Sequence, residues 1–173
     1  MMAAMDVVAL SGTVGAGKST IAVAVRDALL ARGYAAADLD VDEVAHRTAP
    51  ASDDPFNERA VVAHLRSMRE HWRDAGIDVL LLPRVIETAA QRDAYADALG
   101  EPVRVVRIDA PSTTRHARLL ARHDAGPGRD WHLARTDALA DLLVAAGVED
   151  IVVTNDDRAP SAVAGEVVDL LGL

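Results

Sequence analysis

The stretch Gly12-Thr13-Val14-Gly15-Ala16-Gly17-Lys18-Ser19-Thr20 constrains the fold of this chain more than any other. It reads G-x-x-x-x-G-K-S, and it stands between an apolar run, Val7 to Leu10, and a helical pattern that stops at Gly33. A strand, a glycine-rich turn and a helix in this order form a phosphate-binding loop. The glycines let successive backbone N–H groups face one anion, and the helix dipole points its positive end at the same place. The stretch therefore predicts a strand–loop–helix unit that binds a polyphosphate.

Two polar side chains at the start of the predicted helix complete this loop. The Lys18 ammonium can reach the β- and γ-phosphates of a nucleotide, and the Ser19 hydroxyl can ligate Mg²⁺. Lys18 is the only lysine among the 18 lysine and arginine residues of the chain. A compact ammonium fits inside a phosphate cradle, and a planar guanidinium does not replace it. We therefore predict that residues 12–20 bind a nucleotide together with its magnesium ion.

Strand and helix patterns alternate along the rest of the chain. Ile77 to Leu82 is a continuous apolar run, as expected of a strand that is buried on both faces, and Trp131 to Ala146 is helical in pattern. The other expected strands are 7–10, 34–39, 103–108 and 151–154, and the other expected helices begin near residues 18, 56, 85, 111 and 159. This alternation predicts one α/β domain, residues 1–173, with a parallel sheet and helices on both faces. Its ligand is expected beyond the carboxyl ends of the strands.

Composition excludes several function classes. The net charge of −9 leaves no basic excess to follow a phosphate backbone, so we expect no nucleic-acid partner. The absence of cysteine excludes disulfides and thiolate metal sites. Residues 1–5 are too short for a signal peptide, and no apolar run approaches membrane-spanning length. We therefore expect a cytoplasmic protein without a membrane partner.

Two carboxylates follow the second predicted strand. Asp40 and Asp42 are two residues apart, so in an extended chain their side chains would point the same way. In phosphoryl transfer, one carboxylate orients the acceptor hydroxyl and accepts its proton, and another supports Mg²⁺. Asp42 is equally well placed to cap a helix. One aspartate or both can be functional, and the sequence does not choose between them.

The third predicted strand ends without an acidic residue. Phosphate-loop ATPases usually have an aspartate there, but this chain has Leu82-Pro83-Arg84, and Asp78 lies at the opposite end of the strand. The magnesium carboxylate is therefore either missing or supplied by Asp40 or Asp42. Arg84 suits an anionic group on the acceptor substrate, or alternatively it is a solvated arginine at a helix start.

A third cluster consists of arginines. Arg115, Arg118 and Arg122 recur on one face of a predicted helix, a glycine-rich break follows at residues 124–130, and Arg129 and Arg135 lie beyond it. A segment of this kind, residues 115–135, is typical of a mobile lid whose guanidinium groups close over the transferred phosphoryl group. The alternative is a charged outer helix face that pairs with nearby aspartates. Asn155, after the last strand, is placed to contact the nucleotide or to form a turn.

Several of these motifs resemble known kinases. Residues 11–20 are similar to the opening of gluconate, shikimate and adenylylsulfate kinases, and Leu39-Asp40-Val41-Asp42 resembles the L-D-x-D that ends their second strand. Residues 53–59 and 74–79 resemble the middle of adenylylsulfate kinases. Pro83-Arg84 is similar to the P-R of adenylate kinases, although the glutamine expected shortly after it lies at Gln91. The resemblance implies the three-layer P-loop fold with strand order 2-3-1-4-5, Mg-ATP as the donor, and a lid from Arg115 to Arg135.

Together these features predict an ATP-dependent kinase, a phosphotransferase that acts on a small-molecule acceptor at a hydroxyl, as a monomer or homodimer. The candidate catalytic residues are Lys18, Asp40, Asp42, Arg118, Arg122 and Arg135, and the candidate acceptor contacts are Asp40, Asp42 and Arg84. One alternative is a nucleoside monophosphate or adenylylsulfate kinase. The other is an ATP-binding regulatory protein with little transferase activity, which the missing strand-three acid favours.

Overall fold

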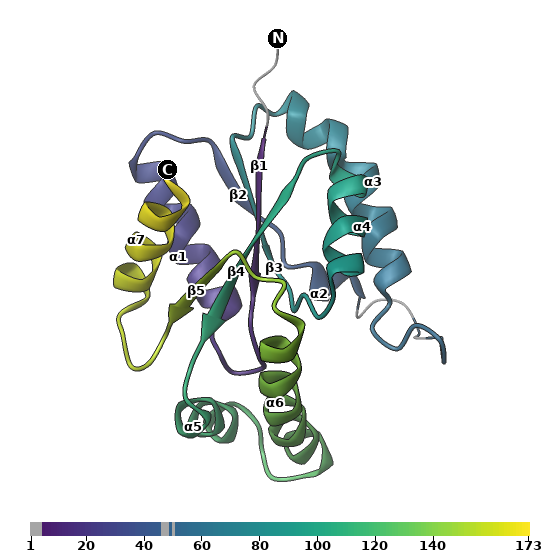
Figure 1. The fold of residues 1–173 in the computed structure, drawn as a ribbon, viewed down its shortest axis with the longest axis vertical. Helices are drawn as coiled ribbons and strands as arrows, with labels where there is room; N and C mark the ends of the chain where they lie inside the picture. The colour runs from purple at the N-terminus through teal and green to yellow at the C-terminus, as the bar shows by residue number, and fades with distance from the viewer. Residues whose placement is uncertain (1–4, 46–48, 50) are drawn as a thin grey trace.

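The structure is a computed structural model that describes residues 5–45, 49 and 51–173. Its centre is a parallel sheet of five strands in the order β2-β3-β1-β4-β5, which confirms the expected strand order (Figure 1). The strands are β1 (Asp6–Ser11), β2 (Ala36–Asp38), β3 (Val79–Pro83), β4 (Val103–Asp109) and β5 (Ile151–Thr154). The four residues before Met5, where no signal peptide was expected, lie outside the described part of the chain.

Helices cover both faces of this sheet, which is why its central strands are apolar throughout. On one face lie α1 (Lys18–Ala31) and α7 (Pro160–Leu171), and on the other lie α3 (Glu58–Asp74) and α4 (Ala89–Leu99) (Figure 1). Successive residues of β1 alternate between the two cores: Val8 and Leu10 pack toward α1 and α7, whereas Val7 and Ala9 pack toward α3 and α4. The sheet is thus the middle of three layers.

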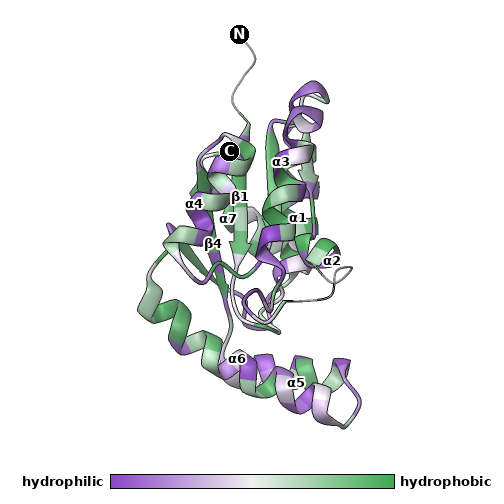
Figure 2. Ribbon diagram, turned by 90° about the vertical axis from the view of Figure 1, so that its right-hand side faces the viewer, coloured by the Kyte–Doolittle hydropathy of each residue, from purple (hydrophilic) through white to green (hydrophobic). Residues whose placement is uncertain are grey.

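Three further helices gather near the carboxyl ends of the strands. These are α2 (Val41–Ala45), α5 (Ser112–Arg122) and α6 (Pro127–Ala146). Figures 1 and 2 show α5 and α6 at the end of the molecule opposite the C-terminus. The Thr136 hydroxyl of α6 donates a 2.7 Å hydrogen bond to the Val14 carbonyl, so this helix packs directly against the glycine-rich loop.

The helices differ from expectation in three places. The helix expected from residue 85 begins at Ala89, because Thr88 caps it by accepting from the Gln91 N–H at 3.1 Å. The break expected at 124–130 is confined to residues 123–126, because Pro127 is preorganised for the first position of α6. Residues 41–45 form a short helix, but Asp42 lies in its first turn rather than capping it, and its N–H donates to the Asp40 carboxylate at 3.1 Å. None of the described helices combines the length and apolar character needed to cross a lipid bilayer.

Candidate active site

The glycine-rich loop between β1 and α1 packs closely against two other strands. Gly12 has φ +138°, and a Cβ there would lie 2.2 Å from the Ile108 carbonyl oxygen of β4. Gly17 has φ +100°, and a Cβ there would lie 2.7 Å from the Asn155 side-chain nitrogen after β5. Both positions require glycine for their backbone conformation and for space. The motif therefore forms the loop that it predicts, seated on the carboxyl ends of the sheet.

Lys18 lies folded against this loop. Its Nζ donates hydrogen bonds of 3.0 Å to the carbonyl oxygens of Gly12 and Thr13. Burial lowers the pKa of Lys18 from 10.5 to about 8, although the carboxylates of Asp42 and Asp40 act in the opposite direction. An arriving phosphate would offer this buried ammonium a stronger partner than the two carbonyls.

The two aspartates after β2 diverge, and the expectation that they point the same way is wrong. The chain turns into α2 at Val41, so it is not extended between them. Asp40 accepts a 3.0 Å hydrogen bond from the Ser19 hydroxyl and another of 3.1 Å from the Asp42 N–H. The Asp42 carboxylate instead pairs with Arg84. The structure thus gives the two carboxylates separate partners, one on the loop side and one on the β3 side.

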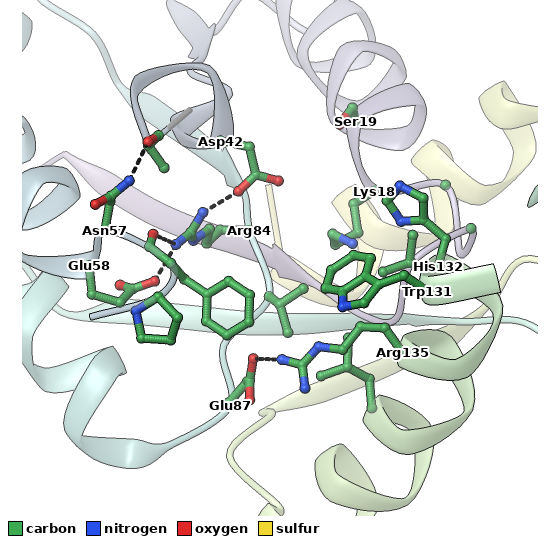
Figure 3. Close-up of a pocket in the computed structure, with 18 of the residues that line it drawn as sticks. Lys18, Ser19, Asp42, Asn57, Glu58, Arg84, Glu87, Trp131, His132 and Arg135 are labelled. Carbon is green, nitrogen blue, oxygen red and sulfur yellow. Dashed lines mark hydrogen bonds and ion pairs between the residues drawn. The ribbon is translucent and has the colours of Figure 1, made fainter. Parts of the chain in front are cut away.

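Arg84, directly after β3, is the centre of a charged cluster. One terminal nitrogen donates to Asp42, and the other donates to Glu58 and to the Phe56 carbonyl at 3.1 Å (Figure 3). The Arg84 side chain is only 8% exposed. It was expected to be open to an anion on the acceptor, or else solvated, but it is buried and paired because two carboxylates converge on it.

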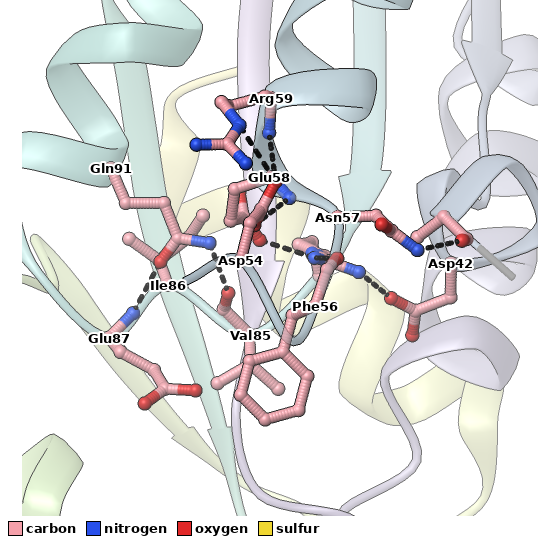
Figure 4. Close-up of polar contacts among 12 residues, drawn as sticks. Asp42, Asp54, Phe56, Asn57, Glu58, Arg59, Val85, Ile86, Glu87 and Gln91 are labelled. Atoms are coloured by element: carbon pink, nitrogen blue, oxygen red, sulfur yellow. Dashed lines mark hydrogen bonds and ion pairs between the residues drawn. The ribbon is translucent and has the colours of Figure 1, made fainter. Parts of the chain in front are cut away.

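Local capping holds this cluster in place. Asp54 accepts from the backbone N–H groups of Glu58 at 2.8 Å and Arg59 at 3.1 Å, which fixes the start of α3 (Figure 4). The Tyr95 hydroxyl of α4 donates to Glu58 at 2.9 Å. Burial, together with Glu58, raises the pKa of Tyr95, so its hydroxyl remains a donor. The Glu58 carboxylate is therefore held between α4 and Arg84.

A main cavity of about 570 Å³ lies beside the loop (Figure 3). Phe56 and Trp131 contribute partly exposed rings to its wall. Arg135 of α6 forms an ion pair with Glu87 across the cavity, and its guanidinium lies 5.1 Å from the centre of the Phe56 ring. The remaining residues of the wall include Lys18, Ser19, Thr20, Asp42, Asn57, Glu58, Arg84, Gln91, Arg122, His132 and Leu139.

A second cavity of about 220 Å³ opens on the other side of the loop. Arg118 of α5 spans it, donating to the carbonyls of Gly15 and Ala16 at 3.3 Å and of Asn155 at 3.2 Å. The Asn155 side-chain amide is buried and donates to Ala16 at 2.8 Å. The two cavities share four residues, namely Gly15, Gly17, Thr20 and Arg122.

The structure brings most of the predicted site residues to these cavities. Lys18, Ser19, Asp42, Arg84, Arg122 and Arg135 line the main cavity, and Arg118 and Asn155 line the second. Asp40 lines neither cavity, and Arg115 does not join them either. Arg115 is buried, donating to the Ala110 carbonyl at 2.5 Å and contacting Asp137 at 3.5 Å, so it stabilises the start of α5 rather than facing a ligand.

Four residues of the main-cavity wall were given no role from the sequence, namely Phe56, Glu58, Glu87 and Trp131. Phe56 and Glu58 lie in the segment that resembles adenylylsulfate kinases, but their residue types do not indicate what they contact. Glu87 follows Arg84 by three residues in an irregular connection, and Trp131 lies in the first turns of α6, where the sequence showed only a helical pattern. Of these four residues, only Glu87 closely follows the carboxyl end of a strand, since β3 ends at Pro83.

The donor set near the loop suits a hard cation. Within the described part of the chain, no three histidine or acidic side chains cluster as a metal site would require. The Ser19 hydroxyl and the Asp40 carboxylate are nevertheless neighbours at 3.0 Å. Oxygen donors of this kind suit Mg²⁺, which takes few protein ligands when nucleotide phosphates supply the others.

A glycine-rich loop seated on a 2-3-1-4-5 parallel sheet, with a cavity on each side, defines the P-loop kinases. The family model for adenylylsulphate kinase matches residues 4–118, about two thirds of the chain. The chain therefore belongs to the adenylylsulphate kinase family, and it is an ATP-dependent kinase with a small-molecule substrate. Comparison with curated protein sequences gives no match.

Solved structures of three kinases share the fold. An APS kinase of Mycobacterium tuberculosis, in complex with AMPPNP and APS, has 22% identity and a TM-score of 0.62, covering 98% of this chain and 99% of that one. Shikimate kinase from Acinetobacter baumannii has 15% identity, a TM-score of 0.64 and coverage of 96% and 93%. A sugar kinase from Janibacter has 18% identity, a TM-score of 0.59 and coverage of 97% and 95%. At these identities the likeness extends to the fold.

Proposed function

We propose that this protein transfers the γ-phosphoryl group of ATP to a hydroxyl of its acceptor, with the donor in the second cavity and the acceptor in the main one. The observation that carries this proposal is that the two cavities meet at the loop. Lys18 lies on the main-cavity side of that meeting point, where the γ-phosphate of a nucleotide would lie. A kinase that draws on ATP in this way would work in the cytoplasm.

On the donor side, backbone groups bind the phosphates and three side chains hold the rest of the nucleotide. The loop N–H groups and the α1 terminus attract the β- and γ-phosphates. Arg118, Asn155 and Arg158 line the second cavity and would contact the base or ribose. The Ser19 hydroxyl and Asp40 would hold Mg²⁺, which when bound neutralises phosphate charge. Asp40 then takes the place of the missing strand-three acid.

On the acceptor side, Asp42 is the proposed general base. It lines the main cavity, and Arg84 fixes the orientation of its carboxylate. The acceptor oxygen forms a bond to the γ-phosphorus while the bond from that phosphorus to the bridging oxygen breaks. ADP leaves, and the hydroxyl proton passes to Asp42. Arg122, which borders both cavities, is the arginine best placed to stabilise charge on the transferred group.

Residues 115–135 remain our candidate for a lid. Arg122 ends α5, and Arg135 reaches into the main cavity from α6, so movement of this helix pair would change access to the site. Closure over the substrates would exclude water from the transferred phosphoryl group. Arg118 contacts the donor side instead, which favours a role in nucleotide binding over one in charge neutralisation.

The test of the proposed function is ADP formation from Mg-ATP with a panel of hydroxylated acceptors. We expect acceptor-dependent turnover in the wild type. Lys18→Ala should reduce it by at least about a hundredfold, because one preorganised cationic donor is lost. Arg66→Ala, an exposed position on α3, is the control and should behave like the wild type. ATP binding without turnover on any acceptor would instead support a regulatory protein.

A further inference from the structure

The acceptor end of the main cavity carries more carboxylates than guanidinium groups. Asp42, Glu58 and Glu87 face Arg84 and Arg135 there, which leaves one excess negative charge. The other cationic side chains of the wall lie at the phosphoryl end. Lys18 is folded onto the loop, and Arg122 borders the donor cavity. The charge of the wall therefore changes sign from the phosphoryl end to the acceptor end.

Arg84 is not available to a bound anion. Both terminal nitrogens are already used by carboxylates, and the side chain is 8% exposed (Figure 3). A phosphate or sulfate that displaced Asp42 or Glu58 would leave that carboxylate near a second anion and without its partner. Two anions placed side by side in this way repel each other. The charge of Arg84 is thus balanced by carboxylates of the cavity wall and is not available to balance the charge of a ligand.

Arg135 is engaged in the same manner. It pairs with Glu87, and its guanidinium lies over the Phe56 ring. Both partners of this pair are mostly buried, with side-chain exposures of 21% and 26%. An anionic acceptor would have to compete with Glu87 for this arginine. Within the described wall of the cavity, neither arginine at the acceptor end is left without a carboxylate.

The rest of this wall suits a hydroxylated ring. Phe56 and Trp131 are 43% and 52% exposed, and flat aromatic faces bind the apolar faces of ring compounds. Carboxylates accept hydrogen bonds from hydroxyl groups and from ammonium groups. The Gln91 amide, also in the wall, adds a donor and an acceptor.

We propose that the acceptor is a polyhydroxylated ring compound without a phosphate, sulfate or carboxylate group, that is, a neutral sugar or an amino sugar. This inference rests on the proposed function and narrows its substrate class. It departs from what the family name suggests, because adenylylsulfate carries negative charge on the part that would enter this cavity. The excess carboxylate at the acceptor end accounts for that departure.

Calorimetric titration with the donor site already filled tests the inference. The protein is saturated with AMPPNP and Mg²⁺ and then titrated with adenylylsulfate. Glu87→Gln removes the carboxylate that competes for Arg135, so it should strengthen adenylylsulfate binding by about tenfold. The control is Glu101→Gln, which removes a similarly paired glutamate outside the cavity and should change nothing. Tight adenylylsulfate binding to the wild type that Glu87→Gln does not improve would overturn the inference.

ADP formation separates this inference from the proposed function. The two acceptor classes that we expect to be phosphorylated are neutral hexoses and hexosamines. The ratio of their rates of ADP formation shows whether the excess carboxylate selects for an amine. Turnover with either class supports the inference. Turnover with adenylylsulfate or nucleoside monophosphates but with neither sugar class overturns it and leaves the kinase intact. Failure of AMPPNP to bind at all would instead contradict the proposed function.

Discussion

The two sides of the glycine-rich loop are constructed differently. The donor side is formed mainly by backbone groups of one continuous stretch, residues 12–20, with Arg118 and Asn155 packed onto their carbonyls. The acceptor side is formed by side chains from α2, α3, α6 and the connection after β3. Backbone N–H groups can bind a polyphosphate regardless of which side chains surround them. A wall of side chains can change its ligand by single substitutions, so the acceptor is where members of one family are free to differ.

The largest effect that separates the two sides is expected from Asp42→Asn. Loss of a general base should lower kcat by about a hundredfold, and the affinity for AMPPNP should stay within about twofold of wild type. Steady-state kinetics and calorimetry on the same preparation measure both quantities. Asp27→Asn, an exposed position on α1, is the matched control. A large loss of AMPPNP affinity in Asp42→Asn would mean that this carboxylate serves the donor.

The backbone character of the donor side predicts the effect of Gly12→Ala. The added Cβ meets the Ile108 carbonyl at a φ of +138°, so the free energy of unfolding should fall by about 2 kcal/mol. Urea denaturation measures it. Gly165→Ala is the control, because Gly165 lies inside α7 with open space around its Cβ, and alanine should stabilise that helix slightly. Equal stability of the two variants would contradict the close packing of the loop on β4.

A smaller effect confined to the donor side is expected from Asn155→Ala. The variant loses the buried hydrogen bond to the Ala16 carbonyl, so the KM for ATP should rise by about tenfold. The KM for the acceptor should not change, because Asn155 does not line the main cavity. A change in the KM for the acceptor without a change in the KM for ATP would contradict the assignment of the nucleotide to the second cavity.

The smallest predicted effect concerns pH. Burial lowers the pKa of Lys18 to about 8 in the protein without nucleotide. Above that pH most molecules carry a neutral Lys18 amine, which must take up a proton when the phosphates bind. The phosphates raise the pKa, so nucleotide affinity should fall as pH rises, by about threefold between pH 7.5 and 8.5. Calorimetry in buffers of different ionisation enthalpy should detect proton uptake at the higher pH. Affinity that increases with pH would contradict this assignment.

The same contrast explains how much the sequence alone could predict. The loop was predictable, because β1, the loop and α1 are adjacent in the chain, whereas the strand order came from the resemblance to known kinases. Asp40 and Asp42 were identified, but their separate partners depend on the turn into α2. The roles of Glu58 and Glu87 were not predictable, since each depends on an arginine from another element. Local sequence patterns predict local geometry, whereas the acceptor wall is formed by tertiary contacts between elements that are distant in the sequence.

The most direct test of the account is a crystal structure of the protein with AMPPNP and Mg²⁺. We expect the γ-phosphate within about 3 Å of the Lys18 Nζ, the base or ribose against Arg118 and Asn155, and the cavity between Asp42 and Trp131 free of nucleotide. A triphosphate bound away from residues 12–20, or a base lying against Phe56 and Trp131, would contradict the account.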